Sequence, residues 1–191
     1  MRALCLGLLL LAMPAAAVFP AEKLVDAAQD RLDANVRYDP AYVRLDYPGG
    51  DVPAETGVCT DVVIRALRAA YGYDLQKEVH EDMRSDFTAY PTNWGLSRPD
   101  RNIDHRRVPN LETFFTRQGW SLGVSDDPDD FAAGDIVSWR LNGRLPHIGI
   151  LTRRDADGNW LAVHNWGAGV QEEPILFAHP MTGHFRMPKA N

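Results

Sequence analysis

The spacing of apolar residues divides this chain into a helical first half and a strand-forming second half. Apolar residues recur every three or four positions over residues 21–35, 58–71, 75–87 and 111–118, which predicts four helices. Glycine or proline follows three of these segments and is typical of a helix end. A polar loop, residues 92–109, separates the third helix from the fourth.

Beyond residue 134 the pattern changes to short runs rich in β-branched and aromatic residues. Such runs cover residues 135–139, 147–152 and 159–165, with a final one around Phe185, and they predict strands. Asp157-Gly158, between the second and third runs, is typical of a hairpin turn. Helices followed by antiparallel strands predict an α+β fold, in which the N-terminal helices pack on one face of a small antiparallel sheet.

The first 17 residues have a different character from the rest. Arg2 precedes a short apolar run, residues 4–13, and small residues follow it. This order is typical of a secretory signal peptide, with cleavage expected near Ala17. The run is too short to span a bilayer, which needs about 20 residues. We therefore expect residues 18–191 to form a single domain that is periplasmic or secreted.

The net charge and the lack of a second long apolar segment exclude two classes of partner. The chain has 20 Lys and Arg against 26 Asp and Glu, a formal net charge of −6. A protein this acidic has no broad attraction to nucleic acid. No other segment is apolar enough to cross a membrane, so we expect neither a nucleic-acid partner nor a membrane span.

Cys59 is the only cysteine outside the predicted signal peptide. A lone thiol in an exported chain is an inert core residue, a link to another molecule or a reactive group. Cys59 begins the second predicted helix, on the apolar face formed by Val62, Val63, Ala66 and Ala70 and opposite Asp61, Arg65 and Arg68. Free N–H groups at a helix start predict a lowered thiol pKa and a site for an oxyanion. We interpret Cys59 as a candidate nucleophile.

A cysteine nucleophile needs a base, and His147 at the start of the second predicted strand is the candidate. Its next neighbour on the same face is Gly149, which leaves room for another backbone or a helix tip to approach. A third residue would orient His147 from the following strand. An even-numbered hairpin loop places His164 on the face of His147, and an odd-numbered loop places Asn165 there. The turn residues suggest even-numbered loops, so we prefer His164 and retain Asn165 as the alternative.

These residues stand in an order that resembles the NlpC-type and CHAP-type cysteine amidases and peptidases of the papain-like superfamily. The matching segments are Gly57-Val58-Cys59-Thr60, Gly134-Asp135-Ile136-Val137-Ser138-Trp139, His147-Ile148-Gly149-Ile150 and Val163-His164. In those families the nucleophile starts a helix, a Gly-Asp-apolar strand follows, and His-x-Gly supplies the base. The resemblance implies a papain-like fold with Cys59, His147 and His164 as catalytic residues.

A closer resemblance, to the bacterial domain-of-unknown-function family 1287, covers nearly all of the chain after the signal peptide. It rests on Tyr47-Pro48-Gly49-Gly50-Asp51-Val52-Pro53, Asp74-Leu75-Gln76-Lys77, Ile103-Asp104-His105-Arg106-Arg107-Val108-Pro109-Asn110-Leu111 and Gly183-His184-Phe185-Arg186. That family is grouped with the papain-like hydrolases, so this resemblance implies the same three catalytic residues.

Three charged residues are candidates for substrate binding. The better-known relatives usually carry Asp-Cys-Ser-Gly at the nucleophile, whereas this chain has Asp61 two residues after Cys59. We expect Asp61 to pair with Arg65 one turn further on, where its carboxylate would also repel acidic substrate groups. Arg106 and Arg107 are candidate clamps for a carboxylate of a peptide, because a guanidinium binds that group with two hydrogen bonds.

Together these features predict an exported cysteine hydrolase that cleaves an amide bond. The resemblance and the predicted compartment imply peptidoglycan stem peptides as the substrate. The alternatives are a non-catalytic cell-wall peptide-binding protein with the same fold and an acyltransferase that uses the same thiol. No cofactor is expected, and Asp104-His105 lacks the further ligands that a metal site needs.

Overall fold

The computed structural model describes residues 19–188. The predicted signal peptide, residues 1–17, and its cleavage point lie outside this range. Within the range, no helix combines the length and the apolar character needed to cross a membrane.

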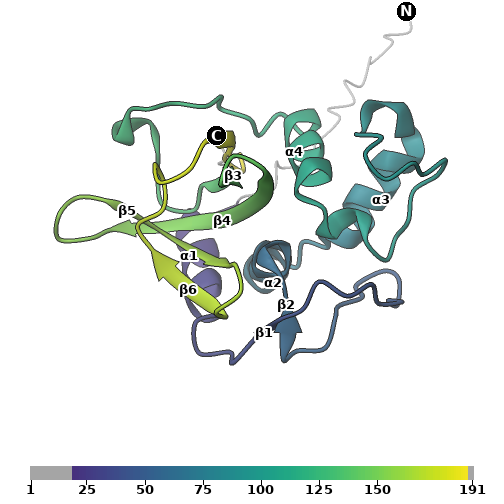
Figure 1. The fold of residues 1–191 in the computed structure, drawn as a ribbon, viewed down its shortest axis with the longest axis horizontal. Helices are drawn as coiled ribbons and strands as arrows, with labels where there is room; N and C mark the ends of the chain where they lie inside the picture. The colour runs from purple at the N-terminus through teal and green to yellow at the C-terminus, as the bar shows by residue number, and fades with distance from the viewer. Residues whose placement is uncertain (1–18, 189–191) are drawn as a thin grey trace, which may run out of the picture.

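Within residues 19–188, four α-helices come before the main sheet (Figure 1). They are α1 (Ala21–Gln29), α2 (Cys59–Tyr71), α3 (Leu75–Ser85) and α4 (Val108–Arg117). Single turns of 3-10 helix lie between α3 and α4, at η1 (Phe87–Ala89) and η2 (Asp104–Arg106), and after α4, at η3 (Pro128–Asp130). Local chemistry sets two of the helix ends. Gly72 closes α2 in the left-handed conformation, and the Asp74 carboxylate accepts hydrogen bonds from the first free N–H groups of α3.

The main sheet has five antiparallel strands in the order β6-β5-β4-β3-β7. The strands are β3 (Ile136–Leu141), β4 (Leu145–Arg154), β5 (Trp160–Asn165), β6 (Val170–Glu173) and β7 (Met181–Phe185). Two short strands, β1 (Arg37–Tyr38) and β2 (Thr56–Gly57), form a separate parallel pair directly before α2. Helices packed on an antiparallel sheet confirm the predicted α+β class.

Strand alternation gives the main sheet two different faces. One face is covered by helices, and its buried residues Ile136, Ile148, Ile150 and Val163 share a core with α1, α2 and α4. The opposite face carries a second cluster around Trp139 and Leu151, which residues Phe131, Ile175 and Leu176 of two loops cover. The indole N–H of Trp139 donates to the Leu176 carbonyl at 2.9 Å and ties one of these loops to the sheet.

The structure differs from the predicted elements in three main respects. The first helix ends at Gln29 instead of residue 35, because the chain turns there toward β1, and Leu32 is left 36% exposed. The fourth helix begins at Val108, since Pro109 fits the first turn, where its missing N–H costs nothing. Strand β6 was not predicted, because its half-buried sequence Val-Gln-Glu-Glu has little apolar signal.

Candidate active site

Cys59 is the first residue of α2, the helix that packs against β4 and β5. Val58 is extended, and its N–H donates to the Asp61 carboxylate at 2.7 Å, which fixes the start of the helix. The predicted apolar face is confirmed, because Cys59, Val62 and Val63 are all buried in the core shared with the sheet. The thiol is only 6% exposed.

The environment of the thiol opposes ionisation. Backbone N–H groups of Ile148, Thr60 and Cys59 itself stabilise the thiolate form, as expected at a helix start. Burial outweighs them and raises the pKa of Cys59 to about 12, with Asp61 adding a smaller effect in the same direction. The predicted lowering of the thiol pKa is therefore wrong for this structure, in which the sulfur is a neutral thiol at pH 7.

His147 and His164 lie together on the sheet. Their ring centroids are 5.0 Å apart and the rings are nearly perpendicular, at 81°. Burial lowers the pKa of His147 to about 3 and that of His164 to about 4, so both imidazoles are neutral at pH 7. The Nε2 atom of His147 and the Nδ1 atom of His164 are buried without a hydrogen-bond partner in the described chain. The Nε2 atom of His164 lies 3.1 Å from a carboxylate oxygen of Glu173 on β6, without the geometry of a hydrogen bond. Such unpaired nitrogens are costly in a core and are typical of a functional site.

A β-bulge decides that His164, and not Asn165, shares the face of His147. Arg154 pairs with Trp160, which leaves an odd-numbered loop of Asp155 to Asn159, and that loop alone would have placed Asn165 there. The register shifts between Leu151 and Arg154. Beyond this bulge, His164 instead of Asn165 therefore lies on the face of His147. The predicted placement of His164 is confirmed, although the predicted even-numbered loop is wrong.

Asn165 belongs to the other face of β5. Its side-chain N–H donates to the Gly57 carbonyl, on β2 before the helix, at 3.3 Å. Asn165 is fully buried, so this contact ties the end of β5 to the segment that precedes Cys59.

The thiol and His147 approach β4 from opposite sides. Cys59 packs with Ile148 on the helix-covered face, whereas His147 and Gly149 lie on the other face with Trp139. A side chain at Gly149 would meet the Val163 carbonyl at 2.9 Å and the Trp139 ring at 3.4 Å. The space at Gly149 is thus filled by the backbone of β5 and by Trp139, so the predicted close approach is confirmed and the approaching segment is the neighbouring strand.

A cavity of about 200 Å³ leads to Cys59. Its walls are mostly apolar side chains from five separate segments, including Tyr38, Pro40, Val58, Trp94, Val108, Pro109 and Pro146. Pro146 directly precedes His147, so the cavity brings the thiol and the start of β4 to one opening. Sequence reasoning missed Tyr38 and Trp94, because neither belongs to a motif and only folding places them beside Cys59.

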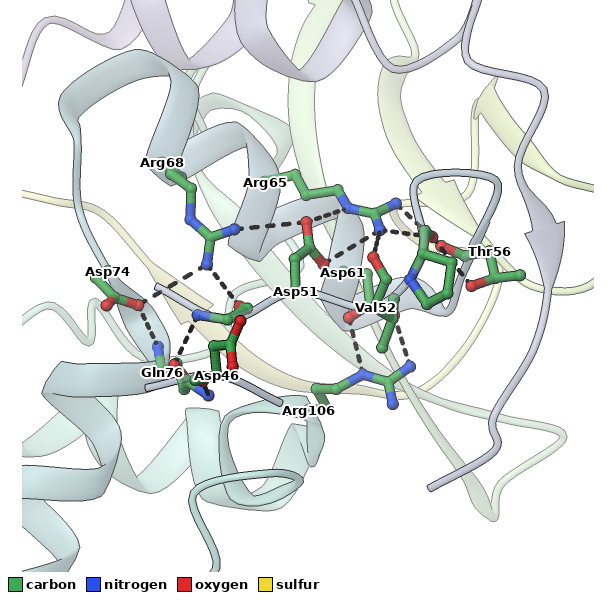
Figure 2. A network of polar contacts seen from close by, with 12 residues as sticks. Asp46, Asp51, Val52, Thr56, Asp61, Arg65, Arg68, Asp74, Gln76 and Arg106 are labelled. Atoms are coloured by element: carbon green, nitrogen blue, oxygen red, sulfur yellow. Dashed lines mark hydrogen bonds and ion pairs between the residues drawn. The ribbon is translucent and has the colours of Figure 1, made fainter. Parts of the chain in front are cut away.

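Asp61 and Arg106 bind each other. The Arg106 Nε and Nη2 atoms donate to the two Asp61 oxygens, each at 2.9 Å, and both side chains are almost fully buried (Figure 2). Arg65 binds Asp51 instead, at 2.9 and 3.1 Å, so the predicted Asp61–Arg65 pair is wrong. With these charges engaged, neither Asp61 nor Arg106 has the free group that the predicted substrate contacts require.

Arg107 is the remaining candidate clamp. Its guanidinium stacks 4.1 Å from the centre of the Trp94 ring, and Nη1 donates to Asp104 at 2.8 Å. Within residues 19–188 its Nε and Nη2 atoms have no hydrogen-bond acceptor, and the side chain lines the cavity of Cys59. Arg107 therefore has donors available for a bound carboxylate.

The fold is similar to two solved structures of an N-acetylmuramoyl-L-alanine amidase from Bacteroides uniformis. The first has a TM-score of 0.56 at 15% sequence identity, covering 88% of this chain and 99% of that chain. The second has a TM-score of 0.51 at 15% identity, covering 86% of this chain and 96% of that chain. At this identity the likeness concerns the fold alone, and it supports the predicted packing of helices on a small antiparallel sheet.

Sequence comparison gives a much closer relationship. The uncharacterized protein YijF of Escherichia coli K12 is 57% identical over 164 residues, which cover 85% of this chain and 80% of that protein. The family model described as Domain of unknown function (DUF1287) matches residues 25–187. The chain belongs to this family.

Proposed function

We propose that this protein is an exported cysteine hydrolase that cleaves an amide bond in peptidoglycan stem peptides. The observation that carries the proposal is the position of Cys59. Its thiol lies at the start of α2, at the end of a cavity, against the N–H of Ile148. The neighbouring residue in that strand is His147, which lies beside His164.

The proposed reaction begins with a neutral Cys59 thiol and a neutral His147 imidazole. His147 takes the proton of the Cys59 thiol as the sulfur attacks the substrate carbonyl and forms the carbon–sulfur bond. The N–H groups at the start of α2 stabilise the oxyanion. The carbon–nitrogen bond then breaks, and His147 gives its proton to the leaving amine. Water, deprotonated by His147, hydrolyses the thioester and restores the thiol.

Proton transfer needs a direct contact between the imidazole and the sulfur. No such hydrogen bond is formed among residues 19–188, and the His147 Nε2 atom is free. In enzymes without substrate, catalytic hydrogen bonds are often long and shorten only in the substrate complex. Because the two side chains lie on opposite faces of β4, we propose that substrate in the cavity turns the ring of His147, near the start of that strand, toward Cys59, and that His164 orients the ring before it turns.

The substrate class rests on three supports. The signal-peptide pattern of residues 1–17 indicates export, which brings the protein to the cell wall. The neighbours of similar fold are N-acetylmuramoyl-L-alanine amidases. The cavity combines apolar walls with the available donors of Arg107, which suits a peptide that carries a carboxylate.

A direct test uses the purified chain without residues 1–17. Muropeptides and intact peptidoglycan are incubated with this protein, with Cys59→Ala and with Cys59→Ser, and the products are followed by mass spectrometry. We expect a product with a new amine and a new carboxylate only from the unaltered protein. The absence of a Cys59-dependent product from every fraction would overturn the proposed substrate.

The two alternatives give different outcomes in the same experiment. A non-catalytic binding protein would retain muropeptides equally with and without Cys59→Ala and release no product. An acyltransferase would form a new amide when a second amine is added, because both reactions share the acyl-enzyme intermediate. Added hydroxylamine, which traps that intermediate as a hydroxamate, separates catalysis from binding alone.

A further inference from the structure

Three arginines that take no part in the proposed reaction surround a second and larger cavity. Arg84 lies in the last turn of α3, and Arg98 and Arg101 belong to the loop that precedes η2. All three line a cavity of about 640 Å³ together with Tyr42, His80 and Asn102. The cavity of Cys59 is lined by other residues of the same loop, so the two cavities are separate.

These arginines have no carboxylate partner. Across residues 19–188, most arginines form ion pairs, but the side chains of Arg84, Arg98 and Arg101 make neither an ion pair nor a hydrogen bond. Arg101 only stacks over the ring of Tyr47, at 5.5 Å. In a chain of net charge −6, three unpaired guanidiniums around one cavity produce a local excess of positive charge.

One carboxylate, that of Asp100, lies in this cavity, and neutral groups already engage it. Its oxygens accept hydrogen bonds from the Tyr42 hydroxyl at 3.0 Å and from the backbone and side-chain N–H groups of Asn102, each at 2.9 Å. His80 adds no further positive charge, because burial and the nearby Arg84 and Arg101 lower its pKa. The cavity therefore has an excess of two positive charges.

The loop that carries two of the arginines is held in place by buried contacts. Gln76 of α3 is fully buried, and its side-chain amide donates to the carbonyl of Asp46 at 2.9 Å (Figure 2). The same amide donates to the carbonyl of Arg101 at 3.1 Å. The Asn102 side chain accepts from the Leu45 N–H at 2.9 Å. A loop fixed in this way loses little conformational freedom when a ligand binds to its side chains.

We propose that Arg84, Arg98 and Arg101 form a second binding site, for a ligand that carries at least two phosphate or carboxylate groups. Guanidinium groups bind both kinds of oxyanion with paired hydrogen bonds, and two negative charges match the excess charge of the cavity. The volume is large enough for a small molecule or for one segment of an anionic polymer. This site does not depend on the proposed reaction at Cys59.

Calorimetric titration of the chain without residues 1–17 tests the site, with pyrophosphate and citrate as probes at low salt. We expect one-site binding of at least one probe, weakened at 0.5 M NaCl by screening of the exposed charges. A preference for pyrophosphate would identify a phosphate ligand, and a preference for citrate a carboxylate ligand. Failure of both probes to bind would overturn the proposal.

Single variants locate the site. All three arginines are exposed, so Arg84→Gln, Arg98→Gln and Arg101→Gln should leave the melting temperature unchanged. We expect each to weaken probe binding about fivefold or more, whereas Arg144→Gln, an exposed arginine far along the chain in the turn after β3, should have no effect. Equal affinities for all four variants would overturn the assignment. Cys59→Ala should bind the probes normally, which separates this site from the proposed hydrolase activity.

Discussion

Arg106 donates two hydrogen bonds of 2.9 Å to Asp61, and the two side chains are 2% and 3% exposed. The pair joins η2 to the first turn of α2, two residues after Cys59. Asp61 also accepts from the Val58 N–H on the other side of the thiol. The same carboxylate therefore fixes both the start of the helix and the loop beside the cavity.

Removing one partner of this buried pair should be strongly destabilising. We expect Asp61→Ala to lower the free energy of unfolding by about 3–5 kcal/mol, because Arg106 would remain buried without its counter-charge. Urea denaturation measures the change, with the exposed Asp157→Ala as the control. The double variant Asp61→Leu/Arg106→Met should recover part of the loss. A cost below about 1 kcal/mol for Asp61→Ala would contradict the buried pair.

Substituting His164 should lower activity, whereas substituting Asn165 should lower stability. We expect His164→Ala to lower kcat on muropeptides by roughly tenfold to a hundredfold and to shift its pH profile, because His147 would lose the residue that orients it. Asn165→Ala should instead lower stability, since its side chain holds Gly57 and lies on the opposite face. A loss of kcat in Asn165→Ala with an unchanged melting temperature would reverse the assignment.

Gly149 should not tolerate a side chain. A methyl group there would lie 2.9 Å from the Val163 carbonyl and 3.2 Å from the Cβ of His164. We expect Gly149→Ala to destabilise the fold by about 1–3 kcal/mol and to lower activity by displacing His164. Thermal unfolding and a muropeptide assay on the same sample measure the two effects. Unchanged stability would mean that the space beside Gly149 is open.

Acid should destabilise the protein below about pH 6.5. Burial lowers the pKa of His105 and His147 to about 3 and that of His164 to about 4. Between pH 6.5 and those values the unfolded chain binds protons that the folded chain does not, so stability falls as pH falls. Each histidine contributes about 1.4 kcal/mol per pH unit in that window. Urea denaturation at pH 7.5, 6 and 5 measures the slope, and equal stability at all three values would contradict it.

The thiol of Cys59 should react slowly without substrate. Because burial raises its pKa to about 12, we expect alkylation by iodoacetamide at pH 8 to be at least about tenfold slower in the folded protein than in urea. The rate should keep rising with pH above 9. Mass spectrometry of quenched samples measures it. A fast rate that is constant between pH 6 and 8 would indicate a stable thiolate and contradict the neutral pair.

The pairing of β4 with β5 is a feature that the sequence did not predict correctly. The choice of His164 over Asn165 depended on the parity of one loop, and Asp157-Gly158 suggested an even count. The actual loop has an odd number of residues, and a bulge near Leu151 places His164 on the face of His147 all the same. A bulge depends on how two strands fit against the rest of the sheet, and local sequence carries little sign of it.

The sequence by itself determined the helix-then-strand order, the family and the position of Cys59 at the start of a helix with His147 at the start of a strand. These follow from apolar spacing and short motifs, which act over a few neighbouring residues. Only the tertiary structure decided the protonation of the thiol, the pairing of Asp61 with Arg106 and the opposite faces taken by Cys59 and His147. Burial and charge pairing depend on segments far apart in the chain, and those segments meet only on folding.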